Sequence, residues 1–187
     1  DVLEVSQSRM GKVLVSDQGE KKTSGIIVET EAYRAPEDKA CHAYRNRRTE
    51  RTEIMFAEGG HAYIYLCYGI HHLFNVVTGP EDQAQAVLIR ALQPVEGVEM
   101  MLERRGMEEE KRRLTNGPGK LSQALALHTD WSGLYMPADD APFWIEDREI
   151  QPDRIEQSKR IGIDYSEECA EWPWRFTWKG NDWVSNE

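Results

Sequence analysis

Two carboxylates lie close together in a stretch that otherwise has the pattern of a strand. Glu29 and Glu31 are separated by one residue, and Tyr33 and His42 follow them. Side chains two positions apart on a strand share a face, so Glu29, Glu31 and Tyr33 should project to the same side. A carboxylate beside an aromatic ring is partly desolvated, which raises its pKa and makes it a better general base. The stretch therefore allows two interpretations, a solvated sheet face or a site in which one glutamate is a base.

A second candidate is a predicted β-hairpin over residues 61–79, with Tyr68 and Gly69 near its tip. Tyr63 and Tyr65 share one face of its first strand, and packing aromatics of an edge strand remain an open interpretation of this pair. Tyr68 is different, because a large ring at a turn has few buried side chains to pack against. An aromatic residue on a protruding hairpin is suited to insertion between base pairs.

Three other kinds of site are less favoured. Cys41 and His42 are adjacent, and neighbouring side chains on an extended segment point apart, which does not suit a thiol nucleophile and its base. The histidines have no HxH or HExxH spacing, so ordinary surface or core histidines are favoured over a metal site. The segment 116–123, NGPGKLSQ, has a glycine-proline turn before a helix; a phosphate site and a plain helix start both stay open there.

The elements that must position these residues are mostly sequential strands. Alternation and turn residues predict an α+β fold with an antiparallel sheet, formed by one domain over residues 1–187. A long irregular segment, 34–60, separates the first strands from the hairpin and is typical of a functional loop. The expected strands are 12–16, 24–33, the hairpin 61–79, 84–92, 143–147 and 175–179, and the expected helices are 94–106, beginning at Pro94, and 118–127.

Composition limits the class of protein. The 187 residues are 40% hydrophobic, which indicates a folded globule, and no apolar run is long enough for a membrane span. Three cysteines without CxxC spacing indicate neither a disulfide framework nor a zinc ribbon. A net charge of −10 argues against indiscriminate nucleic-acid binding, but residues 45–51, RNRRTER, are locally basic. We expect a soluble, intracellular monomer.

Nine stretches of the sequence resemble the alkyladenine DNA glycosylase family, the enzymes that excise 3-methyladenine and hypoxanthine, and they occur in the same order as in that family. The resemblance covers nearly the whole chain and implies that the antiparallel sheet is curved like an open barrel, with a protruding hairpin and flanking helices. The stretches are GKVLV, VETEAYRAPEDKACH, RTERTEIMF, AYIYLCYGIHHLFNVV, AVLIRALQP, NGPGKLSQALAL, RIGI, PWRF and WVS.

The resemblance implies roles for individual residues. Glu31 matches the general base, whereas Glu29 remains a supporting or solvated carboxylate. Arg90 matches an arginine that holds the nucleophilic water, and Ile161 a position whose backbone carbonyl does the same. The remaining matches are Tyr33, His42 and Tyr65, which enclose the flipped base; Asn75, which hinders guanine lesions; Tyr68, which intercalates; and Arg47, Thr49, Arg51 and Lys120, which contact the DNA backbone.

Some positions depart from the family pattern. Glu53 stands where some relatives have a basic residue, and His71 and His72 replace bulkier aromatic residues. These departures bear on DNA affinity and lesion range rather than on the chemistry.

The resemblance implies a monofunctional glycosylase that acts on double-stranded DNA with damaged purines, in the cytoplasm or nucleoid of a bacterium or the nucleus of a eukaryote. Glu31 would activate a water, and no metal or cofactor is expected. The matched pocket positions include no lysine, so no Schiff-base lyase step is expected. Two alternatives stay open: a non-catalytic nucleic-acid-binding module, and a hydrolase of small nucleosides, which would need neither Tyr68 nor the basic segment.

Overall fold

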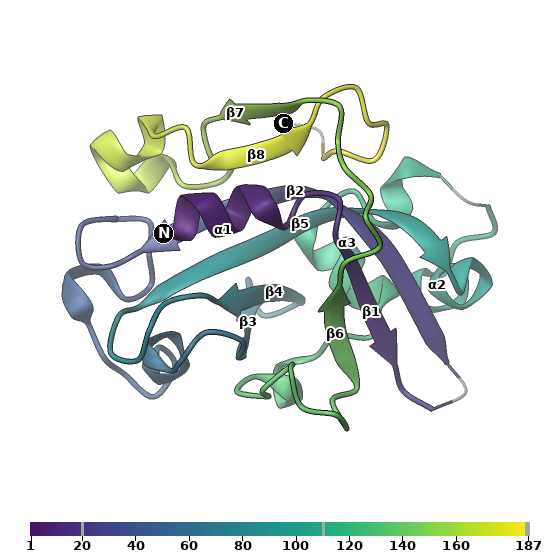
Figure 1. The fold of residues 1–187 in the computed structure, drawn as a ribbon, viewed down its shortest axis with the longest axis horizontal. Helices are drawn as coiled ribbons and strands as arrows, with labels where there is room; N and C mark the ends of the chain where they lie inside the picture. Colours follow the sequence, from purple (N-terminus) through teal and green to yellow (C-terminus); the bar gives the residue numbers. More distant parts are fainter. Residues whose placement is uncertain (20, 110, 186–187) are drawn as a thin grey trace.

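A single antiparallel sheet forms the centre of the protein. In the computed structural model, which describes residues 1–19, 21–109 and 111–185, eight strands pair in the order β3-β4-β5-β2-β1-β6, with β8 on β2 and β7 on β8. The sheet curls into a half-barrel (Figure 1). The strands are β1 (Val13–Asp17), β2 (Lys22–Arg34), β3 (Ala62–Cys67), β4 (His71–Val77), β5 (Gln85–Glu96), β6 (Phe143–Glu146), β7 (Ile155–Ser158) and β8 (Arg175–Trp178).

The longest strand, β2, connects all parts of the sheet. It pairs with β5 along one edge, while its other edge pairs first with β1 and then, around Thr30, with β8. Because β2 has neighbours on both edges and packing on both faces, almost its whole length is buried. Polar side chains on this strand therefore need partners within the protein.

In the described part of the chain three short α-helices pack against the sheet, and each begins or ends at a recognisable residue. Asp1 caps α1 (Val2–Ser8) by accepting a hydrogen bond from Leu3 N–H. Gly97 and Gly106, both with positive φ, flank α2 (Val98–Arg105), and Pro118 opens α3 (Pro118–Ala124). The 3₁₀ turns are Tyr44–Asn46, Glu53–Phe56, Arg112–Leu114, Thr129–Trp131 and Asp164–Glu171.

The main core lies between the sheet and these helices. α1 packs on β2 and β5, and α3 packs on β4 and β5. Phe74, Ile89, Leu121 and Phe143 are among its fully buried side chains. Each such side chain contributes roughly 1.5–3 kcal/mol by leaving water, so this core fixes β5 and β2 firmly relative to each other.

The predicted α+β fold and its antiparallel hairpin are confirmed, with one error at Pro94. The predicted helix start at Pro94 is wrong, because β5 continues to Glu96 and α2 begins at Val98. Pro94 pairs with Gly25 where the register shifts, a position that tolerates the missing N–H of proline. The helix α1 and the strand β7 were not predicted. No helix in the described parts of the chain is long and apolar enough to cross a membrane.

Candidate active site

The two central strands are irregular where the predicted site lies. In the pairing of β2 with β5, Ile27 is opposite Leu92, Glu29 opposite Ala91 and Thr30 opposite Ile89. Val28 on β2 and Arg90 on β5 are therefore extra residues. Bulges of this kind re-aim side chains, and here they bring the Arg90 guanidinium to both glutamates of β2.

Glu31 is completely buried and held by three groups. Its Oε1 accepts a hydrogen bond from Ile161 N–H at 2.7 Å, and its Oε2 accepts from the Tyr33 hydroxyl at 2.8 Å and Arg90 Nη1 at 3.3 Å. Burial raises the pKa of Glu31, and repulsion from Glu29 adds to this, while Arg90 and the two hydrogen bonds oppose it. The carboxyl group thus combines fixed geometry with raised basicity.

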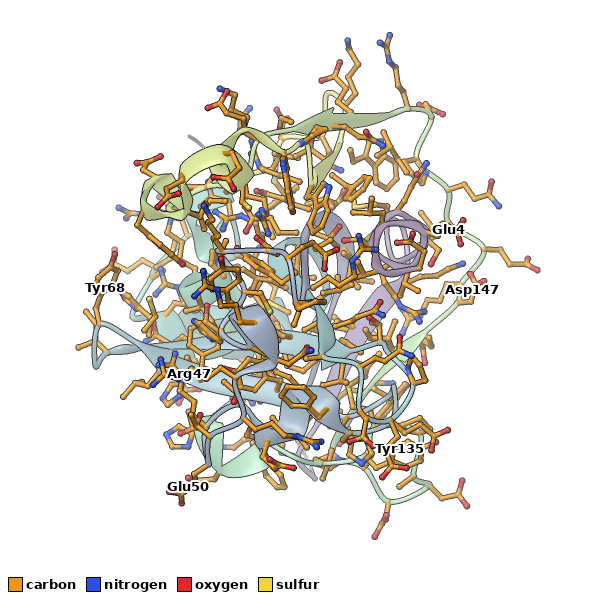
Figure 2. The ribbon with its side chains drawn as sticks, turned by 90° about the vertical axis from the view of Figure 1, so that its left-hand side faces the viewer. Glu4, Arg47, Glu50, Tyr68, Tyr135 and Asp147 are labelled. Atoms are coloured by element: carbon orange, nitrogen blue, oxygen red, sulfur yellow. The ribbon has the colours of Figure 1, made fainter. Side chains whose placement is uncertain are left out.

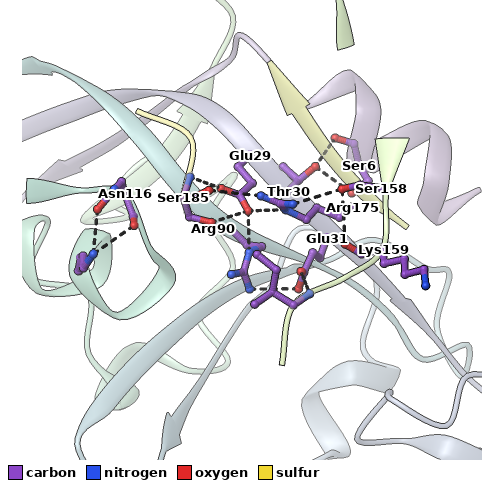
Figure 3. Close-up of polar contacts among 12 residues, drawn as sticks. Ser6, Glu29, Thr30, Glu31, Arg90, Asn116, Ser158, Lys159, Arg175 and Ser185 are labelled. Carbon is purple, nitrogen blue, oxygen red and sulfur yellow. Dashed lines mark hydrogen bonds and ion pairs between the residues drawn. The ribbon is translucent and has the colours of Figure 1, made fainter. Parts of the chain in front are cut away.

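Glu29 is also completely buried, so the interpretation of the two glutamates as a solvated sheet face is wrong. Its Oε1 accepts hydrogen bonds from Arg90 Nε at 2.9 Å, Arg175 Nε at 2.8 Å and the Ser185 hydroxyl at 2.8 Å, and its Oε2 accepts from Ser185 N–H at 2.7 Å. Figure 3 shows this network, in which Arg90 connects the two carboxylates. Strand parity could not reveal it, because β8 and residue 185 come from the far end of the sequence.

A cavity of about 410 Å³ opens beside this network. Ala86, Leu88 and Arg90 of β5 and Tyr33 of β2 line it, as alternate residues on one face of each strand must. It brings together most of the residues predicted for the base pocket and the chemistry: Tyr33, His42, Tyr65, Asn75, Arg90 and Ile161.

Aromatic rings and an amide shape the cavity wall. His42 Nδ1 is hydrogen-bonded to the Tyr63 hydroxyl at 2.8 Å, and its ring meets Tyr65 edge-on at 4.6 Å. Burial, and secondarily the charge of Arg51, lower the pKa of His42 to about 4, so its ring is neutral at pH 7. Asn75 is anchored by donating from Nδ2 to the Tyr63 carbonyl at 3.0 Å.

The hairpin of β3 and β4 ends in exposed apolar side chains. Tyr68 is 91% exposed, has a positive φ of 50° and projects from the body of the protein (Figure 2). Leu66 and Ile70 beside it are exposed as well. A ring held out in this way has no packing role, so the predicted position of Tyr68 at the tip is confirmed.

The basic segment, residues 45–51, reaches the cavity through Arg51, which lines it. The Arg51 guanidinium lies over the Tyr65 ring at 5.0 Å, and Arg47 is exposed. Thr49 is half-buried and hydrogen-bonds Thr52, which stabilises the turn. Arg48, in contrast, is paired with Asp82 and Glu53.

Lys120 lies outside the cavity lining. Its ammonium group, at the start of α3, bonds the Asn116 side chain at 2.9 Å. Burial, and then the nearby cations Arg105 and Arg113, lower its pKa. Lys120 therefore lies near two other cations, Arg105 of α2 and Arg113, rather than in the cavity.

One buried ion pair near the site was not predicted from the sequence. Arg160 donates to Asp38 through Nη1 at 2.5 Å and Nη2 at 2.8 Å, with both side chains fully buried. Its guanidinium also lies over the Tyr33 ring at 4.7 Å. The pair joins the loop after β2 to the segment that carries Ile161, two regions with no local signal of contact.

The whole-chain comparison decides the family. Residues 1–182 match the family described as "Methylpurine-DNA glycosylase (MPG)". The chain belongs to this family. A protein of Bacillus cereus (strain AH820), named "Putative 3-methyladenine DNA glycosylase", is 45% identical over 195 residues, covering 100% of this chain and 95% of its own. A Chlamydia abortus (strain DSM 27085 / S26/3) protein of the same name is 49% identical over 177 residues, covering 94% and 92%.

As a methylpurine-DNA glycosylase, the protein is a DNA repair enzyme that acts on DNA. The expectation of a glycosylase is therefore confirmed at the level of the family. Within the described residues, no three histidine, cysteine, aspartate or glutamate side chains are grouped so as to hold a metal ion.

Proposed function

We propose that this glycosylase flips alkylated or deaminated purines out of duplex DNA and hydrolyses their N-glycosidic bond with a water activated by Glu31. 3-Methyladenine is the expected substrate, and hypoxanthine and ethenoadenine are further candidates. The observation that carries the proposal is a fully buried, hydrogen-bonded carboxylate beside a cavity walled by Tyr33 and Tyr65.

Recognition rests on the aromatic residues. Flipping a base costs a few kcal/mol, and least for a damaged or mismatched base. Tyr68 would fill the gap in the duplex. Stacking contributes roughly 1–3 kcal/mol per base, so Tyr33 and Tyr65 can offset this cost. Their faces also favour a cationic alkylated purine over its neutral parent. Asn75, anchored in the cavity wall, would hinder guanine lesions, and the neutral His42 can bind the nucleotide without adding a charge.

The chemistry requires a water below the anomeric carbon of the sugar. As the glycosidic bond breaks, its electron pair leaves with the base, and the water oxygen bonds the carbon while Glu31 takes its proton. General-base catalysis of this kind contributes about 10²- to 10⁴-fold. Arg90 and the backbone of Ile161 would hold the water and the carboxylate in line.

The products would be a free base and an abasic site. Among the described residues none of those lining the cavity is a lysine, and the proposal therefore includes no Schiff-base step with the sugar. Arg47, Thr49, Arg51 and Lys120 would contact the phosphates around the lesion. A module that only binds DNA gains nothing from a carboxylate at the pocket, since phosphates repel it, which favours the enzyme.

The test is an excision assay with the wild-type protein on duplexes with 3-methyladenine, 7-methylguanine, hypoxanthine or ethenoadenine, and on undamaged duplex. We expect free base from at least the 3-methyladenine duplex, an alkali-labile strand and no borohydride-trapped adduct. Release from free nucleosides but not from duplexes would instead identify a nucleoside hydrolase. No release from any substrate would contradict the proposal.

A further inference from the structure

Arg90 makes a shorter hydrogen bond to Glu29 than to Glu31, the proposed base. Arg90 Nε lies 2.9 Å from Glu29 Oε1, whereas its Nη1 lies 3.3 Å from Glu31 Oε2. One guanidinium is therefore divided between two glutamates, with the shorter contact to Glu29. Neither carboxylate lines the cavity, but the three residues that hydrogen-bond Glu31, which are Arg90, Tyr33 and Ile161, all do.

Glu29 is itself fixed from the opposite side. Arg175 of β8 donates through Nε, and Ser185 donates through both its backbone N–H and its hydroxyl. Within the described residues, this network joins two buried carboxylates, Glu29 and Glu31, to two buried arginines, Arg90 and Arg175 (Figure 3). Buried charges require partners of opposite sign, so each of these groups holds the others in place.

We propose that Glu29 is a positioning residue for the reaction: by holding Arg90 Nε, it keeps the guanidinium from closing on Glu31 and so leaves that carboxylate free for the water. The inference rests on the proposed function, because it gives Glu29 a role only if Glu31 is the base. It goes beyond the family resemblance, which assigns Glu29 nothing more than a supporting or solvated place.

Removal of the Glu29 charge has two physical consequences. Arg90 Nε then has only a neutral acceptor in place of a charged one, so the guanidinium can turn into a two-pronged pair with Glu31, the geometry that guanidinium and carboxylate groups prefer. Glu31 also loses the repulsion of a neighbouring anion, which lowers its pKa. Both effects make Glu31 a weaker base. The other groups that act on it, Tyr33 and Ile161 N–H, are left in place, as are the more distant Arg160 and Tyr65.

The direct test is Glu29→Gln, measured by single-turnover excision across pH with enzyme in excess. We expect the rate at pH 7 to fall roughly 10- to 100-fold, as for other supporting residues behind a reacting group. The midpoint of the acid limb of the pH–rate profile should move to lower pH, because Glu31 no longer feels the repulsion of the Glu29 charge. Affinity for the lesion duplex should not change. An unchanged midpoint, or one at higher pH, would overturn the proposal.

A second variant changes the residue that holds Glu29 from the side opposite Arg90. Arg175→Gln leaves Glu29 free to hold Arg90 more completely and removes a cation, so the midpoint should move to higher pH. If Glu29→Gln does not fold, Arg175→Gln provides the test instead. A midpoint of its pH–rate profile that is unchanged or at lower pH would contradict the proposal. Glu29→Asp, which keeps the charge, should restore the wild-type midpoint. A purely structural role would slow all variants at every pH without opposite shifts.

A matched control removes a carboxylate from the neighbouring strand β5. Glu96→Gln, at the partly exposed end of β5, should leave both rate and midpoint unchanged. The outcomes also separate the inference from the proposed function. If the wild type excises bases, Glu31→Gln does not, and neither Glu29→Gln nor Arg175→Gln moves the midpoint, only the role of Glu29 fails.

Discussion

Removing one partner of the buried pair between Asp38 and Arg160 should cost more stability than most single substitutions. Both side chains are fully buried, the contact is bidentate, and Arg160 also donates to the carbonyls of Ala32 and Cys169. In Asp38→Asn the guanidinium stays buried without a counter-charge. Removing one partner of such a pair costs about 3–5 kcal/mol, and the lower end applies because asparagine keeps one acceptor.

This loss can be converted into a melting temperature. For a chain of this size, 1 kcal/mol corresponds to about 2–4 °C, so a loss of about 3 kcal/mol lowers the Tm by about 6–12 °C. Differential scanning calorimetry or thermal circular dichroism measures this. Excision at 25 °C should also slow, because Arg160 precedes Ile161, whose N–H holds Glu31.

The control for Asp38→Asn is an exposed ion pair. Asp147 contacts Lys12 at the surface, with more than half of its side chain in water. Asp147→Asn should shift the Tm by less than about 2 °C, since exposed pairs contribute little. If Asp38→Asn lowers the Tm no more than Asp147→Asn does, the reasoning about the buried pair is refuted.

Three further predictions concern the pocket and the DNA contact. Tyr68→Ala should weaken lesion-duplex binding by about 1–3 kcal/mol with an unchanged Tm, and unchanged affinity in fluorescence anisotropy would remove the wedge role. Arg47→Ala should weaken binding to all sequences and reduce the slope of log affinity against log salt by about 1; an unchanged slope would exclude a phosphate contact. The pKa of His42 falls from 6.5 to about 4 on folding, so the unfolded chain binds a proton that the folded protein does not in this window. Stability should therefore drop as the pH falls from 6.5 to 4, and His42→Gln should remove up to about 3 kcal/mol of that loss in urea titrations; an identical pH dependence would contradict the shift.

Local patterns predicted the parts of the site that depend on neighbours in the sequence. Strand alternation correctly placed Glu29, Glu31 and Tyr33 on one face, since the extra residue of β2, Val28, precedes all three. A tyrosine before a glycine correctly indicated the exposed tip of the hairpin. These features follow from backbone geometry within a few residues.

Contacts between distant segments were not predictable in this way. The burial of Glu29 depends on Arg175 and Ser185, which lie 146 and 156 residues further along the chain. The pair of Asp38 with Arg160 spans 122 residues. A single sequence carries no signal for such partners, because an arginine or a serine on its own is most often a surface residue.

The central claim is that Glu31 activates the water that hydrolyses the glycosidic bond. Glu31→Gln keeps the size of the side chain and an acceptor oxygen for Ile161 N–H but removes the basic carboxylate. Its single-turnover excision of 3-methyladenine from duplex DNA should be slower than wild type by at least about 10²-fold, with lesion binding retained. Excision by Glu31→Gln at the wild-type rate would contradict the account.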